Sequence, residues 1–594
     1  MASNPKTTSP LPSPSRRCYK KLRKETTEAV KPARQMNETA QQTFQEQFLE
    51  QDYGGLVLHT LSFLDLPTLL RKQVVSKQFK NLCTNAIIAK CGKCGPKHHT
   101  NATLKETVQR YCDILYRKES CVYDMEEIAC TNGFPIDSWN VSQVTDMSNI
   151  FSDNTFFDEY IGSWDTSNVT KMDSLFENAG QFNQDIGRWN VSKVRTMIKM
   201  FDTATEFDQY IGQWDVSQVR DMSKMFARTL NFNQDIGQWD VSNVRDMEGM
   251  FAGAYEFNQD IGQWDVSSVR DMEGMFGALH FNQDIGKWDV SNVTNLSEMF
   301  RGASAFNQDI RGWDTSNVIF MDRMFEGAQE FNQDIGSWDT SNVQDMHHMF
   351  YGAFVFNQDI GNWNVSRVIV MHGMFYNANQ FNQYIGSWDV SSVRDMHLMF
   401  RGAHHFNQDI GSWDVSRVTD MSKIFKWAYE SNQDIGSWNV SCVGDMNCMF
   451  KGASKFNQDI GSWDVSRVTD MSMMFCGAHE FNQDIGNWDI SFVFWMSNMF
   501  EDARSFKHSL RSWDIYHVKL TNGMLPEDFP ESFWPQNMHF RQKNYCRDDS
   551  DESIEITFSK SRPIPGNFEV GGYSYNSSSY QLIAKWDSRN WQAK

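Results

Sequence analysis

The feature that most constrains this chain is a 25-residue unit that recurs through most of its 594 residues. Sixteen tryptophans mark the copies, and every interval between them is 25 residues except one of 24. They are Trp139, Trp164, Trp189, Trp214, Trp239, Trp264, Trp288, Trp313, Trp338, Trp363, Trp388, Trp413, Trp438, Trp463, Trp488 and Trp513. Such a period predicts a solenoid, in which each unit buries its apolar face only by stacking on its neighbours.

Two shorter periods are visible inside each unit, as in the copy that runs from Phe456 to Glu480. Its Trp-Asp-Val segment alternates apolar and polar residues, as a short half-buried strand does. The Val, Met, Met, Phe and Ala that follow recur at helical spacing. We therefore predict an α/β solenoid, a leucine-rich-repeat-like stack of short parallel strands and short helices.

Polar residues form columns along the predicted stack. The aspartate before the first Met, such as Asp470, is placed to cap the turn that follows it. The column that contains Asn233 and Asn258 predicts a hydrogen-bonded ladder at a turn. There are two more aspartate columns, one directly after the Trp and the other directly before the Ile. Because Asn or Tyr replaces Asp in several units, they predict turn and cap chemistry rather than a metal ladder.

The pattern Ile-x-x-Trp-Asp-Val-Ser-x-Val-x-x-Met-x-x-Met-Phe resembles the repeats of bacterial surface proteins of the BspA-like leucine-rich class. The resemblance covers most of the chain and implies the repeat fold of that class. It implies little about function, because such arrays bind many different ligands. In the bacterial proteins the arrays often act as adhesins, which makes a cell-surface or adhesion protein one alternative function.

The segments outside the repeats complete the predicted domain organisation. We predict a disordered basic tail at 1–45, an F-box-like helical motif at 46–90, a connector or N-terminal cap at 91–130, the repeat solenoid at 131–525 and a C-terminal cap at 526–594. The tail is rich in Pro, Ser, Thr and Lys, a composition typical of disorder. The final segment is set apart because the period fails after Trp513.

The motif ahead of the connector has the pattern of a compact set of short helices. Val57, Leu61 and Leu64 share one helical face, while Asp65 and Pro67 suit the start of the next helix. This segment resembles the F-box, which docks on the Skp-type adaptor of cullin-based ubiquitin ligases. The resemblance assigns adaptor binding to Leu61, Leu64, Leu66, Pro67, Leu69, Leu70, Val75 and Phe79. A small helical cap that seals the array is the alternative interpretation.

The units differ informatively at the two residues before the first Met. Most units have polar residues there, but three carry apolar pairs. The pairs are formed by Ile319 and Phe320, by Ile369 and Val370, and by Phe494 and Trp495. Apolar residues at otherwise polar positions predict contact sites for a protein target. Packing against a neighbouring loop is the alternative.

Histidines raise the question of a metal site. His347, His372 and His397 occupy one column in consecutive units, and stacked imidazoles suit a metal ion or a pH sensor. We expect no carboxylate or cysteine to join them within those units, so we predict a solvated helix face and no metal site.

A second zinc hypothesis concerns the connector. Cys91 and Cys94 precede His98 and His99, but a second ligand pair at finger-like spacing is missing. Free thiols are the preferred interpretation, and we predict no cofactor.

Composition and charge exclude several functions. A net charge of −20 argues against a nucleic-acid partner, because phosphate contacts need Lys and Arg. No apolar run approaches the length of a membrane helix, and the N-terminal segment lacks the apolar core of a signal peptide. Scattered cysteines fit reduced thiols. These features predict a cytoplasmic or nuclear protein that does not contact a membrane.

The motifs favour a binding function over an enzymatic one. The sequence has no phosphate-binding Gly loop, nucleophile elbow or His-Glu metal helix. We expect a non-enzymatic substrate receptor of a cullin-type ubiquitin ligase, with the Skp-type adaptor as one partner and an unknown protein target held by the solenoid. A cell-surface adhesion protein and a cytosolic scaffold with no ligase link are the alternatives.

Overall fold

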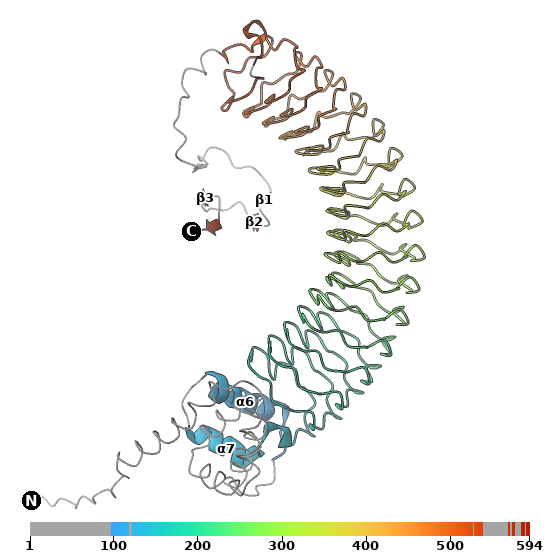
Figure 1. The fold of residues 1–594 in the computed structure, drawn as a ribbon, viewed down its shortest axis with the longest axis vertical. Helices are drawn as coiled ribbons and strands as arrows, with labels where there is room; N and C mark the ends of the chain where they lie inside the picture. The colour runs from blue at the N-terminus through green and yellow to red at the C-terminus, as the bar shows by residue number, and fades with distance from the viewer. Residues whose placement is uncertain are drawn as a thin grey trace, which may run out of the picture.

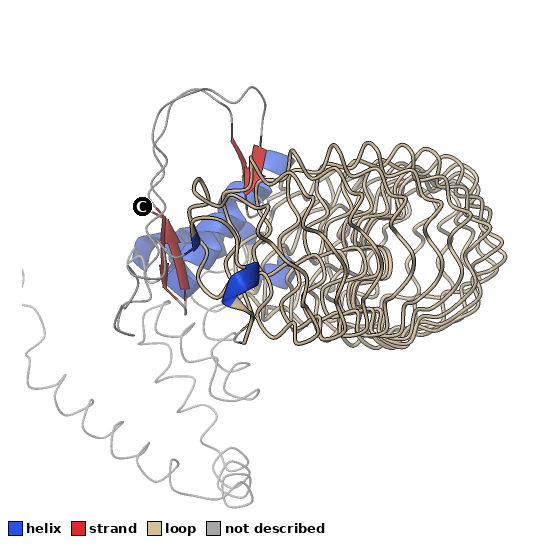
Figure 2. Ribbon diagram, turned by 90° about the horizontal axis from the view of Figure 1, so that it is seen from above, coloured by secondary structure: helices blue, strands red, loops and turns tan. Residues whose placement is uncertain are grey.

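The repeat units form a curved stack that follows the order of the chain (Figure 1). This architecture comes from a computed structural model, which describes residues 97–117, 122–526 and 528–538 and the backbone of four short strands beyond them. Seen from above, the units lie one behind another as a continuous coil of turns (Figure 2). The 25-residue period of the sequence therefore corresponds to a physical repeat.

Each unit consists of tight turns, not of a strand followed by a helix. From the first to the last repeat tryptophan the structure contains no helix and no strand longer than one bridged residue. Met349 N closes a turn on Met346 O at 3.3 Å, whereas His348 N donates to His372 O in the next unit at 2.9 Å. His348 and Gly352 have φ angles of 52° and 67°, which a right-handed helix excludes. The predicted helix is wrong because repeated three-residue turns produce the same apolar spacing.

One parallel β-bridge joins each pair of neighbouring units. The bridged residue is the one before the first Met, and this bridge column runs without interruption from Asp146 to Leu520. Backbone hydrogen bonds support it, as where Met346 N donates to Val370 O of the next unit at 3.1 Å. The pairing therefore lies later in the unit than the strand predicted at Trp-Asp-Val.

Aromatic columns fill the interior of the stack. Trp338 and Trp363 are buried, with parallel rings whose centroids lie 6.5 Å apart. The indole N–H of Trp363 donates to Ile335 O at 3.0 Å, so its polar atom is satisfied. Phe350 and Phe356 stack within the core at 4.0 Å. Each unit thus covers the apolar face of its neighbours, as a repeat protein requires.

The predicted asparagine ladder and aspartate turns are confirmed. Asn357 N donates to Asn332 Oδ1 of the preceding unit at 2.9 Å. In the three aspartate columns, carboxylates accept hydrogen bonds from the backbone two residues later. Examples are Ser472 N to Asp470 Oδ1 at 2.7 Å, Ser466 N to Asp464 Oδ1 at 3.1 Å and Gly461 N to Asp459 Oδ1 at 3.0 Å. The aspartates therefore close turns, although the turn after Asp470 does not begin a helix.

Unequal spacing across the unit explains why the array curves. The tryptophan rings of successive units lie 6.2–6.5 Å apart, as in Trp338 and Trp313 (6.2 Å) and Trp338 and Trp363 (6.5 Å). Beside the bridge column, the rings of His347 and His372 lie only 4.7 Å apart, close to the roughly 4.8 Å of paired backbones. Units that are closer on one side must fan outwards. We infer that the bridge column follows the inner, concave edge (Figure 1).

Helices cover the first unit of the array. They are α6 (Asn101–Cys112), the π-helix η3 (Asp113–Arg117), α7 (Val122–Asn132) and the 3₁₀-helix η4 (Ile136–Ser138). Thr100 caps α6 through a reciprocal hydrogen-bond pair with Thr103. Tyr111 of α6 packs edge-on against Trp139, with centroids 5.7 Å apart. None of the helices that the structure describes is long and apolar enough to span a membrane.

The far end of the array is covered by the chain that follows it. Phe529 stacks on Phe506 at 5.6 Å, and Gln536 forms a parallel bridge with Asp514. The short elements that follow the array in sequence are η5 (Glu531–Phe533) and two antiparallel hairpins, in which β1 (Phe568–Val570) pairs with β2 (Tyr573–Tyr575) and β3 (Ala584–Asp587) pairs with β4 (Asn590–Ala593).

Several predictions concern residues that the structure does not describe. The basic tail, the F-box-like motif with its eight adaptor-binding residues, Cys91 and Cys94 all lie outside the described ranges. The predicted domain boundaries and the adaptor contacts therefore stay predictions. His99 is described, and it is buried with its ring stacked on Trp139 at 5.2 Å.

The asparagine ladder leads to a stability prediction at Asn357. Its Oδ1 accepts from Asn382 N at 2.9 Å and from Gln383 Nε2 at 3.1 Å. Asn357→Ala removes this acceptor, so we expect the free energy of unfolding to fall by about 1–3 kcal/mol in urea titrations. Asn357→Asp keeps an acceptor, as Asp208 does for Asn233 N at 3.0 Å, and should cost less. Equal losses in the two variants would contradict the ladder.

Candidate functional site

The candidate site is the surface along the bridge column, which we call the ladder face. It comprises, in each unit, the bridged residue, the residue before it and the residue two positions after it. In the unit that contains Asp345, these positions are held by Gln344, Asp345 and His347. All three are exposed or half-buried, so the face presents a different set of side chains from each unit at the inner edge.

Two of the predicted apolar pairs meet on this face. Phe320 bridges Asp345, and Asp345 bridges Val370, so the pairs at 319–320 and 369–370 lie two units apart on either side of it. Phe320 and Ile369 are each 43% exposed, whereas Ile319 and Val370 are half-buried. We call these four residues the central patch.

The third predicted pair lies elsewhere. Trp495 is five bridges further along the column than Val370. The rings of Phe494 and Trp495 contact each other at 6.0 Å, and Lys519 Nζ lies 5.3 Å from the Phe494 centroid. These contacts agree with the alternative prediction, local packing against a neighbouring loop, although 37% of the Trp495 surface is exposed.

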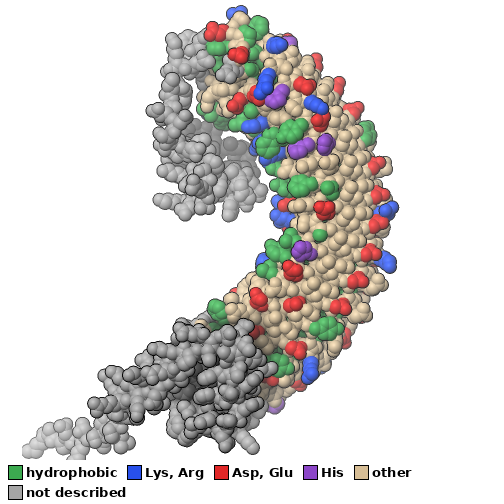
Figure 3. Space-filling view, in the orientation of Figure 1, with side chains coloured by type: hydrophobic (Ala, Val, Ile, Leu, Met, Phe, Trp, Pro, Cys, Tyr) green, Lys and Arg blue, Asp and Glu red, His purple; other side chains and the backbone are tan. Residues whose placement is uncertain are grey.

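Sequence reasoning missed several apolar residues near this third pair. Phe492 is 60% exposed and Tyr516 is 78% exposed, and Leu520 ends the bridge column. The signal for Phe492 was present, because polar residues such as Arg467 hold its column in other units. Figure 3 shows that hydrophobic side chains gather in small separate patches on the array, with acidic side chains scattered along the outer edge. We call Phe492, Phe494, Trp495 and Leu520 the terminal patch.

The histidine column differs from its prediction. His347 and His397 are only 16% and 29% exposed, and neither lies on a helix. Carboxylates do join them: His347 Nδ1 lies 2.8 Å from Asp345 Oδ1, and His397 Nδ1 lies 2.6 Å from Asp395 Oδ1. The predicted solvated helix face is therefore wrong. The aspartate that closes each turn lies two residues before the histidine and reaches its ring.

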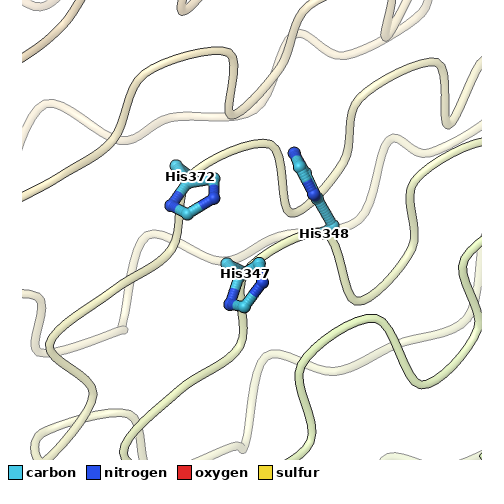
Figure 4. A group of neighbouring side chains, drawn as sticks. All are labelled: His347, His348 and His372. Atoms are coloured by element: carbon cyan, nitrogen blue, oxygen red, sulfur yellow. The ribbon is translucent and has the colours of Figure 1, made fainter. Parts of the chain in front are cut away.

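A fourth histidine, missed in the sequence, completes a cluster with this column. His348 lies beside the stacked rings of His347 and His372, 4.9 Å from the centroid of His372 (Figure 4). Burial and then repulsion from the neighbouring imidazoles lower the pKa of His348 to about 3. Burial also lowers the pKa of His372 to about 4. Both rings are consequently neutral at pH 7, and three ring nitrogens of the cluster lie within 4.8 Å of one another.

Beyond the histidines the bridge column becomes a row of carboxylates. Asp445 lies between Asp420 and Asp470, which bridge it on either side. Burial, followed by repulsion from these two neighbours, raises the pKa of Asp445 to about 6, although a hydrogen bond from Asn447 N at 2.7 Å opposes the change. Several carboxylates therefore lie close together in this part of the ladder face.

Comparison with known families identifies the repeats. A family model described as "Mycoplasma protein of unknown function, DUF285" matches residues 120–229, 209–292, 277–383, 355–447 and 427–530. These overlapping matches run from 120 to 530, which is more than half of the 594 residues. No curated protein matches the chain.

The raised pKa of Asp445 predicts a pH-dependent gain in Asp445→Asn. The folded carboxyl has a pKa of about 6, above its usual 3.8, so the folded state binds more protons between these values and wild-type stability falls as pH rises through them. Asn295 occupies the equivalent position in the bridge column of another unit, so the fold accommodates asparagine there. We expect Asp445→Asn to be more stable than wild type by about 1 kcal/mol at pH 7.5, after allowance for solvent screening, and equal to it near pH 4.

Thermal unfolding at both pH values measures this difference. Asp414→Asn is the matched control, because hydrogen bonds from Ser416 lower the pKa of Asp414 and its removal should give no gain at pH 7.5. A gain for Asp445→Asn that is the same at pH 4 and pH 7.5 would rule out the electrostatic origin.

Proposed function

The chain belongs to the DUF285 family of repeat proteins, and from this premise we propose that it is a non-enzymatic protein whose repeat array holds a protein target. The family description assigns no activity, so the proposal depends on the surface of the array. The observation that carries it is the central patch, where apolar side chains stand exposed at positions that are polar in most units.

The central patch has the properties of a protein contact. Phe320 and Ile369 expose large apolar groups on the inner edge, only two units apart. Buried aromatic and aliphatic anchors supply most of the free energy at protein interfaces, and polar surroundings exclude water from them. The concave edge lets one partner contact several units at once. The terminal patch offers a second contact further along the same column.

Selectivity follows from where the units differ. The outer aspartate turns, such as those at Asp459 and Asp464, repeat almost unchanged and present a uniform surface. A partner that reads only that surface could bind in many registers. A partner that inserts apolar groups against the central and terminal patches has one register, because those patches occur once each.

We further propose that the array is a solenoid of the leucine-rich-repeat-like kind. The unbroken column of parallel bridges and the spacing between units support this class. The unit lacks the helix that our α/β prediction placed in it, so the likeness rests on the bridges and the curvature.

The specific version of the proposal is a substrate receptor of a cullin-type ubiquitin ligase. Its support is the F-box-like sequence, in which Leu64 and Pro67 belong to the segment that resembles the adaptor-binding motif. In this version the motif binds the Skp-type adaptor and the array holds the protein to be modified, in the cytoplasm or nucleus. A surface or adhesion protein is the second candidate, which the resemblance of the repeats to those of bacterial surface proteins favours.

Polar replacement in the central patch tests target binding. Phe320→Asn and Val370→Asn place the asparagine found in this column at Asn295, and Ile369→Thr places the residue that another unit has at Thr469. We expect proximity labelling in cells to lose the proteins captured by the wild-type chain. Thermal stability should change little, because each new residue already serves other units.

The control uses another exposed aromatic. Tyr384 is 53% exposed and directly precedes the Ile-Gly pair of its unit, where most units have aspartate. Tyr384→Asp therefore also replaces an exposed aromatic side chain by a polar one, but at a different position of the unit. It should leave the captured set intact. Unchanged capture by the central-patch variant would refute this patch as the contact.

Copurification with the Skp-type adaptor tests the ligase version. We expect the full chain to retain the adaptor and Leu64→Ala with Pro67→Ala to lose at least about tenfold of it, because both residues belong to the segment that resembles the adaptor-binding motif. The central-patch variant is the control and should still bind the adaptor. If the wild-type chain fails to bind, the ligase role fails while target binding by the array can still hold.

A further inference from the structure

We propose that His347, His348 and His372 form a binding site for one divalent transition-metal ion of the zinc type. The first two residues belong to one unit and the third to the next, and their rings surround a common space (Figure 4). Ring centroids lie 4.7 Å apart for His347 and His372 and 5.5 Å apart for His347 and His348. This site is independent of the target-binding proposal.

A glycine in the neighbouring unit allows the three rings to converge. His348 leans over Gly373, where a Cβ atom would lie 2.2 Å from His348 Cδ2 and 2.5 Å from His348 Nε2. Other residues at this position of the unit include Arg323 and Leu398, which also have positive φ angles. Side chains of that size at 373 would occupy the place of the His348 ring. The glycine thus opens the space in which His348 meets His372.

Ring nitrogens remain available for a ligand. His372 Nδ1 is buried without a hydrogen-bond partner, 3.7 Å from Asp395 Oδ2, and an unsatisfied buried nitrogen costs free energy unless something binds it. His347 Nδ1 contacts Asp345 Oδ1 at 2.8 Å, which leaves Nε2, 3.9 Å from Asp322 Oδ2, to coordinate the ion. A carboxylate on the far nitrogen of an imidazole is the usual way in which proteins orient a zinc-binding histidine.

The donor set selects the class of ion. Three imidazoles with one open position suit Zn²⁺, and also Cu²⁺ or Ni²⁺, whereas Mg²⁺ and Ca²⁺ prefer oxygen ligands. The nitrogens lie within 4.8 Å of one another and must approach to about 3.4 Å around a tetrahedral zinc ion. Small rotations of half-buried side chains supply this movement, and the ion would then link two successive units.

A neighbouring arrangement competes for one of the ligands. His372, Asp395 and His397 also have ligand atoms within 4.8 Å of one another. In that set, however, His397 Nδ1 contacts Asp395 Oδ1 at 2.6 Å, so two of its three ligand atoms are already engaged with each other.

Zinc bound per chain tests the site on the full-length protein. Wild type and His348→Gly with His372→Ser are loaded with Zn²⁺, dialysed and analysed for metal, and the affinity is measured by competition with a chelator. Glycine occupies the position of His348 in the unit that contains Gly274, and serine occupies the position of His372 in the unit that contains Ser422. The apo variant should therefore unfold at the same temperature as apo wild type. We expect the variant to bind one zinc ion fewer per chain, with at least a hundredfold weaker affinity at this site. Zinc bound by Cys91 and Cys94 would be the same in both proteins, so the difference in zinc content between wild type and variant excludes it.

Two further variants distinguish this site from its neighbour. Asp345→Asn should weaken zinc binding about tenfold, as loss of an orienting carboxylate does. His397→Ser should leave the affinity unchanged, and Mg²⁺ should not compete. Equal zinc content in wild type and the double variant would overturn the proposal. So would loss of the ion in His397→Ser, because it would place the metal in the competing set.

Discussion

Backbone hydrogen bonds between neighbouring units are the interaction on which the rest of this structure depends. Met346, His348, Phe350 and Gly352 all direct their N–H groups to carbonyls of the following unit. A unit therefore cannot satisfy its own backbone, and each unpaired buried group would cost about 1–3 kcal/mol. The ends of the array need other partners. At the start, Asn101 Oδ1 accepts a hydrogen bond from Thr145 N at 2.9 Å.

The two sides of the unit satisfy this requirement in different ways, and the difference shapes the molecule. Along the bridge column, backbone meets backbone and the units lie close together. On the opposite side, Asn332 and Asn357 insert a side-chain amide between the backbones, which holds the units further apart. The array curves as a result, and the bridge column lies on the inner edge. Side chains that are one unit apart in sequence become close neighbours there.

The close inner spacing gives the ladder face its chemical variety. The central patch, the histidine cluster and the row of carboxylates around Asp445 all occupy the same column or the positions beside it. Elsewhere the unit is constrained by the core and by turns that close on aspartate. Evolution of a binding function in such an array is expected at these positions, because they alter the surface without disturbing the stack.

Much of the interior could be predicted from the repeated pattern. The buried columns, the asparagine ladder and the turn-closing role of Asp470 follow from residue type and position. The helix was mispredicted because apolar spacing of three and four residues does not distinguish a helix from successive turns with positive φ. The carboxylates beside the histidines were missed for another reason. The aspartate that reaches each ring lies two residues before the histidine, in a different column of the repeat.

By itself, the sequence determined that identical positions stack, because a 25-residue period leaves no other way to bury sixteen tryptophans in register. Only the tertiary structure decided which edge is concave and where side chains converge. Those outcomes depend on φ angles and on which carbonyl of the next unit each N–H reaches, neither of which the period specifies. His348 shows the difference. Its position in the unit was evident, but its approach to His372 depends on the space above Gly373.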